Sequence, residues 1–85
     1  MRTPFLIIST EEVWRQFVSG ALVDLSNIVF DDDLAQYDPG QVLNVFLRTN
    51  AERENNGPIV AQILARSNAL TEQDPRWYQF TIRQA

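Results

Sequence analysis

Apolar and polar residues alternate with a period of two in three segments of the second half of the chain, and this pattern constrains the fold most. The segments are 41–49, 58–66 and 76–83. Successive side chains of a β-strand point to opposite faces, so the alternation predicts three strands. Apolar residues occupy both faces of most of these segments. We therefore expect a small closed or half-closed barrel, which has few exposed strand edges, rather than an open sheet with one face in water.

The first twenty residues predict one further strand and one helix. The apolar run Phe5–Ile8 is typical of a short buried strand. Ser9, with Glu12 three residues later, has the spacing of a capping box, so we expect a helix over about 10–19 that ends at Gly20. The apolar stripe of this helix is formed by Val13, Trp14, Phe17 and Val18.

Residues 21–30 have the composition of another strand, with a bend at Ser26–Asn27. Asp38-Pro39-Gly40 predicts a tight turn before the first alternating segment, since proline presets one φ angle and glycine accepts a positive one. The first two alternating segments should form a hairpin. The chain is thus predicted to be a single α+β domain over 1–85, a five-stranded β-barrel or curled sheet with one N-terminal helix.

The chain contains no cysteine, no histidine and no lysine, and all seven of its basic residues are arginine. It therefore has no thiolate nucleophile, no imidazole acid or base, no Schiff-base lysine and no Cys/His zinc ligand. Carboxylate, hydroxyl, phenol and guanidinium groups remain. We expect a protein that is not an enzyme, with no catalytic residue, no metal and no cofactor.

The formal net charge is −4 and the isoelectric point is about 4.5. A negative field opposes broad, non-specific binding of nucleic acid and suits a basic protein partner, although a local arginine patch is compatible with it. Residues 1–8 show no secretory signal, and no stretch approaches the ~20 apolar residues of a membrane span. We expect a soluble, cytoplasmic protein that does not bind membranes.

Four residues of the predicted strands are candidates for binding a nucleotide or RNA. Arg48 and Arg66 are predicted on corresponding faces of the hairpin, where two guanidinium groups can hold a phosphate or a carboxylate. Arg76 precedes Trp77, whose ring lies on the less apolar face of the last strand and can stack on a base. The alternatives are salt bridges with neighbouring acids for the arginines and a place in the core for the tryptophan.

Asp31, Asp32 and Asp33, with Asp38 nearby, form the densest cluster of charge. Carboxylates bind calcium and magnesium, but the spacing lacks the glycine and the glutamate of a helix–loop–helix calcium site. Runs of like charge in loops are usually solvated. The third interpretation is an acidic contact surface, so these four aspartates are candidates for binding a basic protein partner.

Four short segments follow one another along the chain in an order that is typical of one protein family. They are Ser19-Gly20, Tyr37-Asp38-Pro39-Gly40-Gln41-Val42-Leu43, Gly57-Pro58-Ile59-Val60-Ala61-Gln62-Ile63 and Trp77-Tyr78-Gln79-Phe80-Thr81-Ile82. In this order they resemble the ASCH family of the PUA-like superfamily, above all its short phage and bacterial members. The resemblance covers about residues 5–83. It implies a small PUA-like β-barrel and a ligand such as a nucleotide, an RNA end or a modified base.

The chain departs from this family where the family is catalytic. ASCH-type amidohydrolases carry a lysine and a threonine just after the glycine that ends the helix, and here Ala21, Leu22 and Val23 stand in that place. At the start of the following strand, Gln41 stands where members of the family usually have an acid. Asp31–Asp33 stands where they have a basic cluster. The resemblance therefore implies a member without amidohydrolase activity and with less capacity to hold RNA.

Three functions remain open at this point. The first is a non-catalytic PUA-like binding module for a nucleotide or RNA. The second is an acidic, phage-type inhibitor that binds a basic host protein, such as a nucleic-acid-binding protein, through the aspartate cluster. The third is a small hydrolase that uses carboxylates and a hydroxyl. The net charge favours the second relative to the first, and the missing lysine and threonine disfavour the third.

Overall fold

The computed structural model describes residues 3–48, 58–69 and 76–85, and these form one curled sheet, one α-helix and one 3₁₀ helix. The elements in chain order are β1 (Phe5–Ile8), α1 (Glu11–Val18), β2 (Val23–Ile28), η1 (Asp31–Tyr37), β3 (Val42–Leu47), β4 (Ile59–Ala69) and β5 (Trp77–Gln84). The strand order is β1-β3-β4-β5-β2, in which β1 and β3 are parallel and the other pairs antiparallel. The predicted α+β class and the hairpin of β3 and β4 are confirmed.

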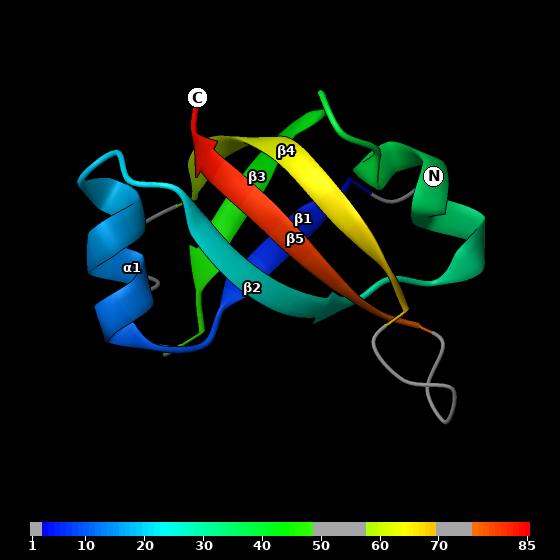
Figure 1. The fold of residues 1–85 in the computed structure, drawn as a ribbon, viewed down its shortest axis with the longest axis horizontal. Coiled ribbons are helices and arrows are strands. Elements are labelled where there is room, and N and C mark those ends of the chain that lie inside the picture. Colours follow the sequence, from blue (N-terminus) through cyan, green and yellow to red (C-terminus); the bar gives the residue numbers. More distant parts are fainter. Residues whose placement is uncertain (1–2, 49–57, 70–75) are drawn as a thin grey trace.

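The sheet curls until it is nearly closed, with α1 at one end of the barrel and η1 at the other (Figure 1). The inward faces of all five strands, together with Trp14 and Phe17 of α1 and Tyr37 of η1, make up one core. In β3 the inward residues alternate as the sequence predicts, and they are Leu43, Val45 and Leu47. Residues 49–57, which connect the two strands of the β3–β4 hairpin, lie outside the described residues.

Helix α1 begins one residue later than the capping box predicted. Thr10, not Ser9, is the N-cap, because its extended backbone lets its hydroxyl oxygen accept the amide of Val13 at 3.3 Å. Gly20 ends the helix as predicted, with a φ of +95°. The predicted stripe is narrower than expected, since Phe17 is fully buried while Val18 is 45% exposed.

Strand β2 is shorter than predicted and continues through Ser26–Asn27 without interruption. The expected bend at Ser26–Asn27 is absent, because β5 pairs with β2 residue by residue from Val23 to Ile28. A continuous partner strand holds the small polar residues in extended conformation. Residues 31–37, whose run of aspartates is typical of a solvated loop, instead form η1. Leu34 and Tyr37 are three residues apart, which is one turn of a 3₁₀ helix, and both pack against the core.

Strand β4 carries irregularities that the alternation did not predict. The pairing of β4 with β5 shifts register between Ile63 and Ala65 and again between Arg66 and Ala69. An extra residue reverses the side to which the following side chains point. Ala65, predicted on the same face as buried Ile63, is therefore exposed, while Arg66 is half-buried.

Candidate functional site

The candidate site lies over the seam between β1 and β2, the two edge strands of the sheet. Side chains close the barrel at this seam in place of a strand pair. The sheet order places β1 and β2 at the two ends of the sheet. Asn27 of β2 reaches across to β1, where its Oδ1 accepts the amide of Ile7 and its Nδ2 donates to the carbonyl of Ile7, both at 3.0 Å. The side-chain amide thus satisfies both backbone groups of Ile7 on the free edge of β1.

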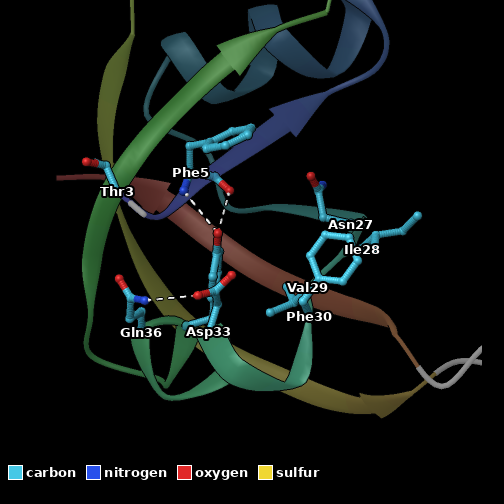
Figure 2. A pocket seen from close by; sticks show the side chains of 9 residues that line it. Thr3, Phe5, Asn27, Ile28, Val29, Phe30, Asp33 and Gln36 are labelled. Atoms are coloured by element: carbon cyan, nitrogen blue, oxygen red, sulfur yellow. Dashed lines mark hydrogen bonds between the residues drawn. The ribbon is translucent and has the colours of Figure 1, made fainter. Parts of the chain in front are cut away.

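Tyr37 forms a second pair of hydrogen bonds to the same free edge of β1. Its hydroxyl accepts the amide of Phe5 at 3.2 Å and donates to the carbonyl of Phe5 at 3.3 Å (Figure 2). Beside it is a hollow of about 100 Å³, lined by Thr3, Phe5, Asn27, Ile28, Val29, Phe30, Asp33, Gln36 and Tyr37. This volume is well below the 300 Å³ or more that small-molecule ligands usually occupy.

A larger hollow of about 300 Å³ lies over the outer side of the seam. It is lined by Phe5, Ile7, Ser9, Ser26, Asn27, Ile28, Arg48 and Trp77. Trp77 reaches it from β5, where it pairs with Ile28. Arg48 follows the end of β3, and its backbone amide donates to the carbonyl of Ile8 at 3.0 Å. Two of the four residues predicted to bind a nucleotide therefore line one hollow.

A second hollow of about 290 Å³ adjoins the first. It shares Ser9, Ser26 and Trp77 with it and adds Ile8, Thr10, Val13, Asp24 and Leu25. Asp24 is held in place by Thr81 of β5, whose hydroxyl donates to Asp24 Oδ1 at 2.5 Å. We call the two hollows together the seam groove. Its lining combines one indole ring, one guanidinium, one carboxylate and several hydroxyls.

The other two predicted arginines do not line the seam groove. Arg66 donates to Asp38 Oδ1 at 2.8 Å and to the carbonyl of Leu34 at 3.1 Å, and it lies 5.8 Å from the ring centre of Tyr78. The β3–β4 register places Arg66 and Arg48 at opposite ends of the hairpin. The expectation that they grip one phosphate together is therefore wrong, because Arg48 follows β3 while Arg66 lies in the second half of β4, and antiparallel pairing puts these two positions at opposite ends.

Arg76 also has a partner, since its guanidinium lies 5.7 Å from the ring centre of Phe30. Its backbone carbonyl accepts the amide of Val29 at 2.8 Å, which continues the pairing of β2 with β5 by one residue. Phe30 lines the smaller hollow beside Tyr37 and neither hollow of the seam groove. Arg76 thus lies at the margin of the seam rather than in the groove.

The aspartates predicted to bind a basic partner differ in their surroundings. Asp38 and Asp32 are both exposed, but Asp38 pairs with Arg66. Asp33 is half-buried and accepts a long hydrogen bond of 3.5 Å from Gln36. Asp31 is the first residue of η1. Across the described ranges, the acids do not form a group of three that could hold a metal ion.

Sequence reasoning named Arg48 and Trp77 but missed Asp24, Ser26 and Asn27 as parts of a site. A signal was present, because these three polar residues interrupt an otherwise apolar strand. Polar residues inside a strand that a barrel should bury need a partner or face water. Here Asn27 closes the seam, and Asp24 and Ser26 line the groove outside it.

No family model matches the chain, and no curated protein or solved structure matches it either. Within residues 3–48, 58–69 and 76–85, no helix is long and apolar enough to span a membrane. The function is therefore argued from the seam groove itself.

Proposed function

We propose that the protein is a non-catalytic binding module of PUA-like type, and that the seam groove binds a nucleotide or the end of an RNA. The observation that carries the proposal is that Arg48, which follows β3, and Trp77 of β5 line the same hollow of about 300 Å³. An arginine supplies charged hydrogen bonds for a phosphate, and an indole ring supplies a face on which any base can stack.

The surroundings of the two residues support this proposal. Among the described residues, no acid pairs with the guanidinium of Arg48, in contrast to Arg66, which is paired with Asp38. Trp77 is half-buried, so the strands hold the ring while part of it remains accessible. The hydroxyls of Ser9 and Ser26 and the amide of Asn27 add polar groups that orient a ligand. The ASCH-like assignment remains part of this proposal, supported by the barrel-like sheet with one helix between β1 and β2.

Fluorescence titration and calorimetry with adenosine 5′-monophosphate and with a short single-stranded oligoadenylate test the proposal. We expect Arg48→Gln to weaken binding about tenfold or more, since a charged hydrogen bond is lost, and Trp77→Ala to weaken it further. Arg83→Gln is the matched control. Arg83 is exposed and lies on β5, so this substitution makes the same change in charge outside the groove. Equal affinities for Arg48→Gln, Arg83→Gln and the unmodified protein would contradict the proposal.

The second candidate function is an acidic module that binds a basic protein. The exposed Asp32 at the start of η1 favours it, as does the net charge of −4. Its contact surface would lie on η1, separate from the seam groove, so substitutions in the two places distinguish the two functions.

A further inference from the structure

Opposite charges lie in the two hollows of the seam groove. Arg48 lines only the larger hollow, and Asp24 lines only the adjoining one, while Trp77 lines both. We propose that the groove selects a ribonucleoside 5′-phosphate with a free 2′,3′-diol, with the phosphate at Arg48, the base on Trp77 and the ribose hydroxyls at Asp24. This inference rests on the proposed function and specifies its ligand.

Asp24 is arranged to accept hydrogen bonds from a ligand. It lies on the outer face of β2 directly opposite Thr81. The hydroxyl of Thr81 donates to Asp24 Oδ1 at 2.5 Å, which fixes the orientation of the carboxylate. Within the described part of the chain, Oδ2 of Asp24 has no hydrogen-bond donor. An ionised carboxylate has about four acceptor positions, so this one retains capacity for hydroxyl donors.

The two charges also fix the direction in which a nucleotide lies. A phosphate is attracted by Arg48 and repelled by Asp24, and like charges placed together cost several times the thermal energy. Reversing the nucleotide would put its phosphate against the carboxylate and its hydroxyls against the guanidinium, which has no acceptor. The shared wall of Trp77, Ser9 and Ser26 keeps base and sugar between the two ends.

The chemistry that Asp24 would recognise distinguishes RNA from DNA. The 2′-hydroxyl is the group by which proteins separate the two, and a carboxylate is a known type of acceptor for ribose hydroxyls. A free diol occurs in a ribonucleoside 5′-phosphate and at the 3′ end of an RNA strand. Both sources present the same chemistry to the groove.

The experiment measures dissociation constants of the whole protein for four probes. They are adenosine 5′-monophosphate, its 2′-deoxy analogue, an oligoadenylate tetramer and the same tetramer with a 3′-deoxy end. We expect the unmodified protein to bind adenosine 5′-monophosphate about tenfold or more tightly than its 2′-deoxy analogue, since the analogue loses a hydrogen bond to a charged group. A preference confined to the mononucleotide pair identifies a free nucleotide, and one that includes the tetramers identifies an RNA end.

Asp24→Asn should reduce the preference to near one, because the amide retains the shape but loses the charged acceptor. Asp32→Asn is the matched control, because it makes the same change in charge on η1 and should leave the preference unchanged. If Trp77→Ala weakens the binding of all probes but the unmodified protein does not distinguish diol from deoxy probes, the selectivity for ribose is overturned and the nucleotide function stands. If no probe binds to the unmodified protein, both are overturned.

Discussion

At the scale of single residues, the side-chain amide of Asn27 takes the place of a neighbouring strand, because it bonds both backbone groups of Ile7. Asn27→Leu keeps the approximate volume and removes both hydrogen bonds to the backbone of Ile7. Leaving these partly buried groups without partners should lower the free energy of unfolding by about 1–3 kcal/mol. Urea unfolding measures the change. Ser26→Ala changes the exposed residue just before Asn27 and should change the free energy of unfolding by less than about 0.5 kcal/mol. Equal losses for both variants would show that the hydrogen bonds from Asn27 to Ile7 do not stabilise the barrel.

Two neighbouring residues of α1 provide a second test at this scale. Phe17 is 0% exposed and Val18 is 45% exposed. Phe17→Ala removes a ring from the core and should cost about 3–5 kcal/mol, which is enough to unfold a marginally stable domain. Val18→Ala should cost far less, because its side chain already contacts water. Thermal unfolding followed by circular dichroism compares them, and an unchanged melting temperature for Phe17→Ala would be incompatible with the described core.

At the scale of elements, the free edge of β1 depends on side chains of two other elements. Tyr37→Phe keeps the ring in the core and removes only the hydroxyl that bonds to Phe5. We expect the amide of Phe5 to exchange with deuterium roughly three to ten times faster, which corresponds to the net value of one hydrogen bond. The amide of Ile7, bonded to Asn27, serves as the internal control. Equal acceleration at both amides would indicate a general loss of stability instead.

The elements also show how far the sequence predicts this fold. The faces of β3 and of β5 follow from alternation alone, because a strand has a period of two wherever its pairing is regular. The second half of β4 was predicted wrongly, because a bulge is set by the partner strand. Arg48 and Trp77 were named from the sequence, but their meeting in one groove depends on the order of the strands, which no local pattern encodes.

At the scale of the whole molecule, charge separates the two candidate functions. Replacing Asp31, Asp32 and Asp33 with asparagine changes the formal net charge from −4 to −1, since three negative charges are removed. If the groove binds nucleotides, their affinity should stay the same or increase, because repulsion of phosphate decreases. If η1 binds a basic protein, association should become slower and less sensitive to salt, whose screening length is about 8 Å at physiological ionic strength.

Surface-based kinetics with the triple variant and the unmodified protein, at two salt concentrations, give the sign of the change. A loss of nucleotide affinity in a variant that unfolds normally would contradict the seam groove as the binding site. The variant and the Arg48→Gln protein thus form a pair in which each function predicts one loss and one unchanged result.

The seam has a consequence for how binding and folding depend on each other. The groove takes its walls from both ends of the sheet, β1 on one side and β2 with β5 on the other. A molecule bound there connects two strands that the protein itself joins only by side chains. If a ligand binds the closed barrel more tightly than an opened one, its binding stabilises closure, and opening of the seam weakens its binding by the same coupling free energy. A molecule that binds in the seam groove would therefore make the barrel more rigid along the line between β1 and β2.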